Sequence, residues 1–258
     1  MSFIRFEFHQ GIATIWLNRP EVLNAFNREM ALLLQEHLKD CSEREEVRVV
    51  MITGEGKAFS AGQDLSEVVD PEGPGMKRIL SEHYNPIVRL IRGLEKPVLA
   101  AVNGVAAGAG ANLALCCDLV VAAESAGFIQ AFSKIGLIPD TGGTYFLPRL
   151  IGWQKASAFM MLGEKISSGE AERLGMIYKT FPDVVFRDES EKIAQVLSDM
   201  PTRGLAYTKQ ALNVSMINDL SAQLEAEDTF QQRAAGTSDY KEGVDAFLSK
   251  RKPQFRGK

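Results

Sequence analysis

The segment 97–117 is the feature that most limits what this chain can fold into, because its 21 residues include no charged side chain. That length is sufficient for a helix to cross a membrane. However, its apolar residues are mostly alanine and glycine, polar Asn103 and Asn112 lie inside it, and it is interrupted by Gly104, Gly108 and Gly110. We therefore expect a buried strand, a glycine-rich turn and a buried helix, and no membrane partner.

The remaining chain alternates between strand-like and helix-like runs. Residues 12–17 are short and rich in β-forming residues, and a turn follows them. Asn27 then opens a run in which apolar side chains recur at helical spacing. Residues 47–52 and 119–122 are strand-like, and Arg48 is the one charged residue in the first of them. Strands alternating with helices imply an α/β fold with crossover connections.

The chain changes character after Pro201. No strand-like run follows, and three successive stretches have helical spacing of apolar side chains, around Leu205–Leu212, Leu220–Ala234 and Tyr240–Leu248. We therefore predict an α/β core over residues 1–200 and a helical region over residues 201–258. A helical appendage of this kind is expected to pack on another subunit.

Composition excludes several classes of function. The chain has 29 Lys and Arg against 33 Asp and Glu, a net charge of −4, so a nucleic-acid partner is not expected. Its 3 cysteines are too few for a disulfide framework, which favours a reducing cytoplasm. The first residues lack the apolar run of a signal peptide. None of the 3 histidines has a Cys or acidic neighbour at ligand spacing, so no metal site is expected.

Two stretches of small residues follow predicted strands. Residues 59–65 contain small side chains at 60–62, which would let a ligand approach the backbone N–H groups. Residues 103–112 combine a tight turn with free N–H groups, but they lack the glycine spacing of a dinucleotide site. An ordinary strand-to-helix turn explains the first stretch equally well, and close helix packing explains the second.

Asp140 is the third candidate, and it lies in an apolar frame just before the pair Gly142 and Gly143. Burial there would raise the pKa of its carboxyl group and suit a general base. Aspartate is also a favoured helix N-cap. Taken alone, the stretch 136–144 leaves both roles open.

These stretches, in this order, resemble the crotonase (enoyl-CoA hydratase/isomerase) superfamily. The matching motifs extend along essentially the whole chain and occupy residues 17–20, 23–26, 59–65, 96–104, 142–144, 147–150, 171–175 and 250–255. The resemblance implies a ββα superhelix core with a C-terminal helical region that forms a homotrimer or a dimer of trimers. It also implies an acyl-CoA thioester substrate, with coenzyme A as part of the substrate and no separate cofactor.

The resemblance also assigns roles to individual positions. The backbone N–H groups of Gln63 and Ala109 match an oxyanion hole for the thioester oxygen, and Asp140 matches an acidic residue that abstracts a proton in several members. The positions that match substrate or CoA contacts are Asn24, Ala25, Ala61, Asp64, Leu65, Gly110, Asn112, Phe132 and Phe255.

Two departures from the family pattern bear on the reaction. Hydratases of the family hold a water between two glutamates, and those positions here are Asn112 and Phe132, neither of which can shuttle a proton. A single carboxylate at Asp140 suits a 1,3-proton shift instead. Motifs at residues 61–65, 108–115, 138–143 and 201–204 look like those of ring-1,2-epoxyphenylacetyl-CoA isomerases, which form an oxepin and also shift enoyl double bonds.

The sequence therefore predicts an acyl-CoA isomerase with Asp140 as its base and a carboxyl pKa above the ordinary value. An enoyl-CoA hydratase that uses Asp140 alone and a noncatalytic acyl-CoA binding subunit are the alternatives. The 4-chlorobenzoyl-CoA dehalogenases also have an aspartate at this position, but they pair it with a tryptophan where this chain has Phe132.

Overall fold

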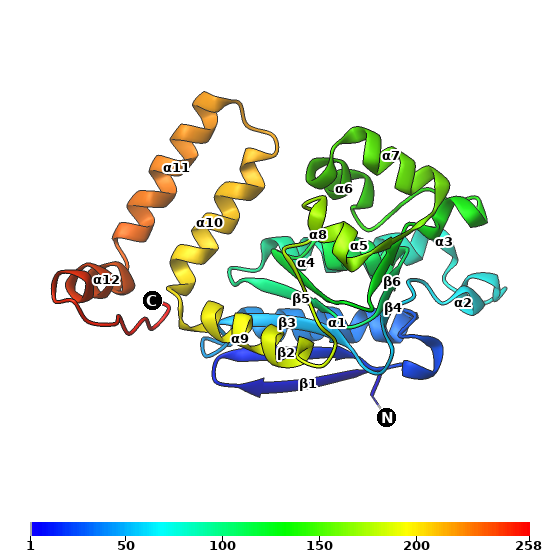
Figure 1. Ribbon diagram of the computed structural model, residues 1–258, viewed down its shortest axis with the longest axis horizontal. Coiled ribbons are helices and arrows are strands. Elements are labelled where there is room, and N and C mark those ends of the chain that lie inside the picture. The colour runs from blue at the N-terminus through cyan, green and yellow to red at the C-terminus, as the bar shows by residue number, and fades with distance from the viewer. Residues whose placement is uncertain (1) are drawn as a thin grey trace.

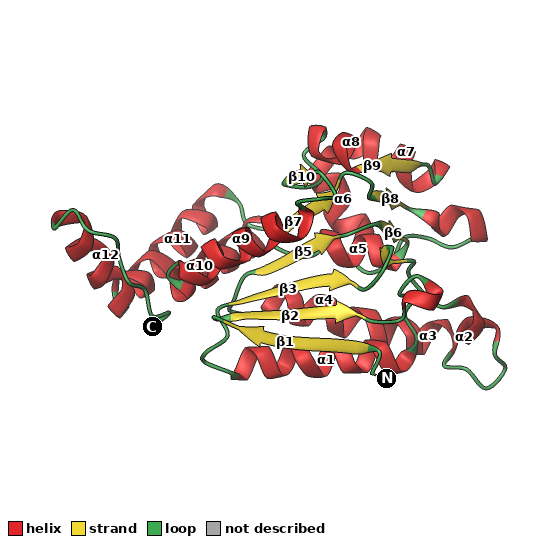
Figure 2. Ribbon diagram, turned by 60° about the horizontal axis from the view of Figure 1, so that its bottom comes forward, coloured by secondary structure: helices red, strands yellow, loops and turns green. Residues whose placement is uncertain are grey.

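In the computed structural model, which describes residues 2–258, helices surround two β-sheets (Figures 1 and 2). The larger sheet has the order β1-β2-β3-β5-β7-β10, and β1 alone runs antiparallel to its neighbour. Its strands are β1 (Ile4–His9), β2 (Ile12–Leu17), β3 (Val49–Gly54), β5 (Val98–Val102), β7 (Leu119–Ala123) and β10 (Lys179–Phe181). The predicted α/β class is confirmed.

The smaller sheet has the order β4-β6-β8-β9. Strands β4, β6 and β8 are parallel, and β9 is antiparallel to β8. Their bounds are β4 (Ala58–Ser60), β6 (Val105–Ala107), β8 (Gly127–Ile129) and β9 (Lys165–Ser167). In Figure 2 this sheet lies beside the end of the larger one, next to α5 (Ala109–Leu115).

The core forms where helices cover the larger sheet. Helix α1 (Arg28–Glu43) packs on β1 and β2, and α9 (Phe186–Asp199) packs on β2, β3 and β7. As a result, every residue of β3 is buried. The predicted opening of α1 is confirmed, because the Asn27 side chain caps it by accepting a hydrogen bond of 3.0 Å from the Met30 amide.

The uncharged segment contains more structure than its sequence predicts. Strand β5 and helix α5 occupy its two ends as expected, but the short strand β6 lies between them in the expected turn. Gly104 allows this close approach, since a Cβ there would lie 2.1 Å from the carbonyl oxygen of Lys57. Among residues 2–258, no helix is long and apolar enough to span a membrane.

Shorter elements connect the sheets and cover their edges. They are η1 (Pro20–Val22), α2 (Leu65–Val69), α3 (Gly75–Arg78), η2 (Ile79–Tyr84), α4 (Asn85–Gly93), η3 (Ala131–Ile135), α6 (Gly143–Ile151), α7 (Trp153–Leu162) and α8 (Ser168–Arg173). Of these, α6 and η3 build the candidate site described below together with α5.

The C-terminal arm, residues 202–258, projects away from the core (Figure 1). It contains the three predicted helices, α10 (Thr202–Ser215), α11 (Leu220–Ala235) and α12 (Ser238–Leu248). Lys209 of α10 ties the arm to the core, because its Nζ lies 2.8 Å from Asp118 Oδ2 and donates to the carbonyl of Ile91 at 2.6 Å. The division at residue 201, with an assembly role for the arm, stays a prediction.

Candidate active site

Three candidate residues follow neighbouring parallel strands of the smaller sheet. Gln63 comes three residues after β4, Ala109 two residues after β6, and Phe132 three residues after β8. Because parallel strands end at the same edge, the topology brings these three positions together. Stretches that are far apart in the sequence therefore form one site.

Gly62 shows how closely the first two turns approach. A Cβ placed on Gly62 would lie 2.8 Å from the carbonyl oxygen of Ala107 and 3.3 Å from the amide nitrogen of Ala109. Gly62 also has a φ of +91°, which favours glycine. Ala109 is the first residue of α5, so its N–H has no acceptor within the helix. The predicted Gln63 and Ala109 donors therefore belong to adjacent turns.

Tyr84 supports the Gln63 turn, a role that no local sequence pattern indicates. Its hydroxyl donates a hydrogen bond of 2.9 Å to Gln63 Oε1, while Gln63 Nε2 donates to Glu67 Oε2 at 2.9 Å. Burial, together with the negative charge of Asp140, raises the pKa of Tyr84 well above its ordinary value. The phenol therefore stays protonated and remains a donor to Gln63.

Asp140 is a partly buried carboxylate whose side chain accepts a 2.7 Å hydrogen bond from Thr141 Oγ1. Burial raises the pKa of Asp140, and the bonds from Thr141 and its own backbone amide offset only part of this shift. The predicted upward shift is confirmed. The alternative role as a helix cap is wrong, because α6 begins after Gly142, which has no side chain to cap it.

Asn112 lies on α5, one turn after Ala109, and has no exposed surface. Its Nδ2 donates to the backbone oxygen of Asp140 at 2.9 Å, and its Oδ1 accepts from Gln130 Nε2 at 2.7 Å. The predicted contact of Asn112 with substrate stays a prediction. Burial and these two bonds direct the amide to protein groups.

Phe132 and Gly110 shape the space around the two turns. Phe132 is buried, and a Cβ on Gly108 would lie 3.7 Å from its ring. A Cβ on Gly110 would lie 2.5 Å from the carbonyl oxygen of Ser60, so glycine lets α5 pack directly on β4. Both residues lie beside the two turns, and their role in binding substrate stays a prediction.

The side chain of Asn24 is also completely buried. Its Nδ2 donates to the carbonyls of Glu55 at 2.9 Å and Ala58 at 2.7 Å, and its Oδ1 accepts from the Arg19 amide at 2.8 Å. The predicted role of Asn24 in binding substrate or CoA stays a prediction. Its side chain holds the loop that carries Ala25.

The remaining residues of this predicted group lie around the same loop. Ala61 donates its amide to the carbonyl of Leu23 at 2.9 Å, and Ala25 accepts from Arg19 Nη1 at 2.6 Å. Arg19 Nη2 also lies 2.9 Å from Asp64 Oδ2.

Asp64 caps α2, and Leu65 is the exposed first residue of that helix. Burial works to raise the pKa of Asp64, but bonds from Ser66 and Arg19 outweigh it and leave the pKa lowered. Asp64 is therefore an ionised structural partner of Arg19, whereas Leu65 is free to touch a ligand.

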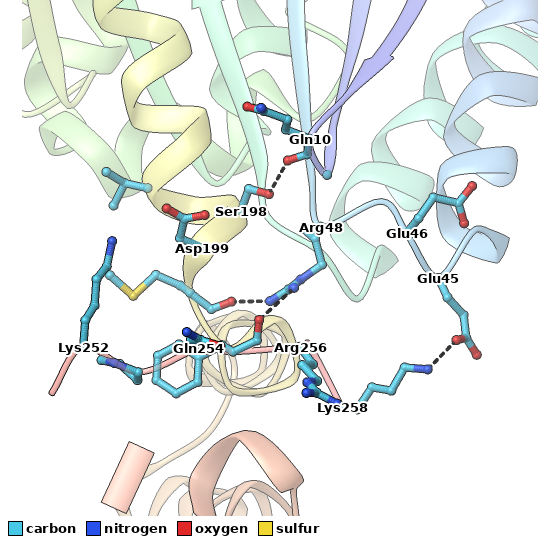
Figure 3. Close-up of a pocket in the computed structure, with 15 residues that line it drawn as sticks. Gln10, Glu45, Glu46, Arg48, Ser198, Asp199, Lys252, Gln254, Arg256 and Lys258 are labelled. Atoms are coloured by element: carbon cyan, nitrogen blue, oxygen red, sulfur yellow. Dashed lines mark hydrogen bonds and ion pairs between the residues drawn. The ribbon is translucent and has the colours of Figure 1, made fainter. Parts of the chain in front are cut away.

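Within one chain, the fold does not bring Phe255 together with the other predicted substrate-binding residues. Phe255 lies beside α12, where a Cβ on Gly243 would be 3.4 Å from its ring. It also lines a cavity of about 1080 Å³ between the arm and the ends of β1 and β3 (Figure 3). Arg48 crosses this cavity and donates to the carbonyls of Met200 at 2.8 Å and Phe255 at 3.3 Å. This cavity includes none of the other candidates, so its size does not identify the reaction site.

The assembled groups define a limited chemistry. Two backbone N–H groups can stabilise negative charge on one oxygen, and a carboxylate with a raised pKa can accept and return a proton. Among residues 2–258, no cluster of three or more His, Cys, Asp or Glu side chains is arranged to hold a metal ion.

Comparison with known proteins agrees with the resemblance in sequence. The profile of the enoyl-CoA hydratase/isomerase family matches residues 7–258. The chain is 47% identical to the 1,2-epoxyphenylacetyl-CoA isomerase of Escherichia coli, with 100% of both chains covered. It is 45% identical to a Rhodobacter capsulatus protein named "Probable enoyl-CoA hydratase", covering 99% of this chain and 98% of that one.

A solved structure supports the same assignment of the fold. The enoyl-CoA hydratase of Bacillus anthracis superposes with a TM-score of 0.93 at 31% identity, covering 99% of this chain and 100% of the other. The expected crotonase-like core with a C-terminal helical region is therefore confirmed.

Proposed function

Because the chain belongs to the enoyl-CoA hydratase/isomerase family, we propose that it is an acyl-CoA isomerase with Asp140 as its single proton-transferring group. The observation that carries the proposal is the position of Asp140. Its backbone is hydrogen-bonded to Asn112, one turn along α5 from the oxyanion-hole candidate Ala109. Burial also raises the pKa of its carboxyl group, which favours a group that must both accept and return a proton.

The proposed reaction moves one proton and leaves the composition of the substrate unchanged. The thioester oxygen accepts hydrogen bonds from the amides of Gln63 and Ala109, so that charge can develop on it. Asp140 removes the proton from the α-carbon, which leaves an enolate extended over the neighbouring double bond. The same carboxyl group then returns the proton to the γ-carbon, which converts a 3-enoyl thioester into a 2-enoyl thioester.

We propose two classes of substrate for this site. One is an aliphatic 3-enoyl-CoA, and the other is the ring epoxide of phenylacetyl-CoA, which isomerises to an oxepin. The similarity to the Escherichia coli 1,2-epoxyphenylacetyl-CoA isomerase supports the second class. The buried ring of Phe132, beside Gly108, offers an apolar wall to either one.

Water addition is the main alternative, and the similarity to the Rhodobacter capsulatus protein favours it. The chain has Asn112 and Phe132 at the two positions where the family's hydratases carry glutamates. For water addition, one carboxylate would therefore have to activate the water and also protonate the product. A noncatalytic acyl-CoA binding subunit is the alternative from another class. Such a subunit would require no proton transfer by Asp140.

A comparison of two substrates separates these functions. We expect the protein to isomerise 3-hexenoyl-CoA, monitored by the absorbance of the 2-enoyl product, much faster than it hydrates crotonyl-CoA. Hydration without isomerisation would favour the hydratase. Binding of both thioesters without turnover of either, or of the ring epoxide, would favour the noncatalytic subunit.

We also propose that the chain assembles as a homotrimer or a dimer of trimers through its arm. Exposed apolar side chains gather on the arm, namely Leu212, Ile217, Leu220, Leu224, Phe247 and Leu248. A second exposed group lies on η3, α7 and the turn after η3, namely Ile135, Ile138, Trp153, Met161 and Leu162. Exposed apolar patches on this scale are typical of interaction surfaces. When the arm patch of one subunit contacts the second patch of the next, the subunits form a ring if the rotation between neighbours closes.

A double substitution tests this assembly. Leu220→Glu with Leu224→Glu places charge on the arm, and we expect it to lower the mass measured by sedimentation equilibrium at micromolar concentration. Val184→Glu is the control, because Val184 is 92% exposed in the loop between β10 and α9, outside both patches. A monomeric wild-type protein, or equal masses for all three proteins, would contradict the proposal.

A further inference from the structure

Asn112 and Gln130 form a buried chain of amides that ends on the backbone of Asp140. Gln130 Nε2 donates to Asn112 Oδ1 at 2.7 Å, and Asn112 Nδ2 donates to the Asp140 carbonyl at 2.9 Å. We propose that these two amides are positioning residues that hold the Asp140 carboxylate in its working orientation. This inference rests on the proposed function of Asp140 as the base.

The turn that carries Asp140 has an unfavourable backbone. Thr141 has a φ of +52° and Gly142 a φ of +77°, and the Gly143 amide closes the turn on the Asp140 carbonyl at 2.8 Å. A positive φ is unusual for a β-branched residue such as threonine. Such a conformation persists only where the surrounding structure enforces it. The amide of Asn112 supplies a second hydrogen bond to the same carbonyl.

The conformation of Thr141 matters because its side chain touches the reacting group. Its Oγ1 donates to Asp140 Oδ1 at 2.7 Å, so the backbone of the turn and the orientation of the carboxylate are linked. If Thr141 relaxed to a negative φ, its hydroxyl would move away from that oxygen. Asn112 thus acts on the carboxylate through the turn.

Packing and burial make the amide chain hard to replace. A Cβ on Gly143 would lie 2.3 Å from Asn112 Nδ2, so the amide fills the space beside the last residue of the turn. Asn112, Gln130 and Thr141 are 0%, 1% and 2% exposed. Bulk water therefore cannot take over a lost hydrogen bond, and removing one amide leaves its partner unpaired.

The test compares Asn112→Ala, Gln130→Met and the double variant by steady-state kinetics. For Asn112→Ala we expect kcat to fall about 10- to 100-fold, as for a misplaced catalytic group, with KM changed by less than about twofold. Gln130→Met should cause a smaller fall. In the Asn112→Ala background it should add little, because Gln130 acts through Asn112.

Gln35→Met is the matched control. Gln35 is also a buried glutamine, and its Nε2 donates to the carbonyls of Glu82 at 2.6 Å and His83 at 3.2 Å. We expect it to lower thermal stability with kcat unchanged. A rise in KM alone for Asn112→Ala would instead indicate direct contact with substrate and overturn the inference. So would a fall in kcat for Gln35→Met equal to that for Gln130→Met.

A crystal structure of Gln130→Met, and of Asn112→Ala if it folds, separates this inference from the proposed function. We expect the turn 140–143 to move and the bond from Thr141 to Asp140 to lengthen. A turn that does not move overturns the positioning role, even when Asp140→Asn is inactive. A fully active Asp140→Asn variant overturns the proposed function. In that case, displacement of the turn 140–143 in the amide variants would still show that the two amides hold this turn.

Discussion

Asp140→Asn is expected to lower turnover by at least about a hundredfold with little change in acyl-CoA binding. Asparagine keeps the size of the side chain but cannot take a proton from the α-carbon. The measurement is kcat on 3-hexenoyl-CoA, with the dissociation constant obtained from titration calorimetry. The loss should exceed that caused by Asn112→Ala in the same assay. A larger loss for Asn112→Ala, with both variants folded, would show that Asp140 is not the base.

The same substitution should stabilise the fold near neutral pH. Burial raises the pKa of Asp140 above the ordinary value of 3.8, so the folded state favours the protonated carboxyl and ionisation opposes folding. This penalty is absent below the unfolded-state pKa, develops as the pH rises through the folded-state pKa, and is complete above it. We therefore expect the thermal midpoint of Asp140→Asn to exceed that of the wild type at pH 7 and to match it near pH 3.

Asp118→Asn should destabilise the fold by about 3–5 kcal/mol, the range for breaking a buried ion pair from one side. Asp118 lies 2.8 Å from Lys209 Nζ and 3.0 Å from Arg92 Nη1, and it also accepts from the Val98 amide at 2.8 Å. Burial lowers the pKa of Lys209, and the charge of Asp118 opposes that shift. Without this carboxylate, two poorly solvated cations lack their partner, and α10 loses its anchor to the core.

Urea unfolding of Asp118→Asn and Glu95→Gln measures this difference. Glu95 also pairs with a cation on α10, since its Oε2 lies 2.9 Å from Arg203 Nη1, but both side chains are about half exposed. Pairs in that environment are worth roughly 0–1 kcal/mol. If the two substitutions cost the same, the buried pair is not what holds the arm to the core.

The sequence was sufficient for elements with strong local patterns. Periodic apolar side chains and the Asn27 cap predicted α1, and residues 12–17 matched β2 at both ends. Strand β3 begins at Val49 instead of residue 47, and the Arg48 side chain just before it donates to the backbone oxygens of Met200 and Phe255. These partners are 152 and 207 residues away in the chain, and no local pattern reveals them.

The candidate site shows the same limit. The family resemblance assigned roles to Gln63, Ala109 and Asp140. Gln63 and Ala109 follow neighbouring strands of the smaller sheet, and the backbone of Asp140 is hydrogen-bonded to Asn112 of α5. The roles of Tyr84 and Gln130 were missed because each depends on a contact made only in the folded chain. The hydrogen bonds of the Asn24 and Asn112 side chains to distant backbone groups were missed for the same reason.

Close packing of backbone at the site also limits how this protein can evolve. Any side chain at Gly62, Gly110 or Gly143 would collide with backbone or with Asn112, so single substitutions there damage the site before they alter selectivity. Leu65 is exposed at the start of α2, and Phe132 contributes an entire ring beside Gly108. New substrate preferences should therefore arise first at positions 65 and 132, while the glycine framework and its proton-transfer chemistry are inherited unchanged.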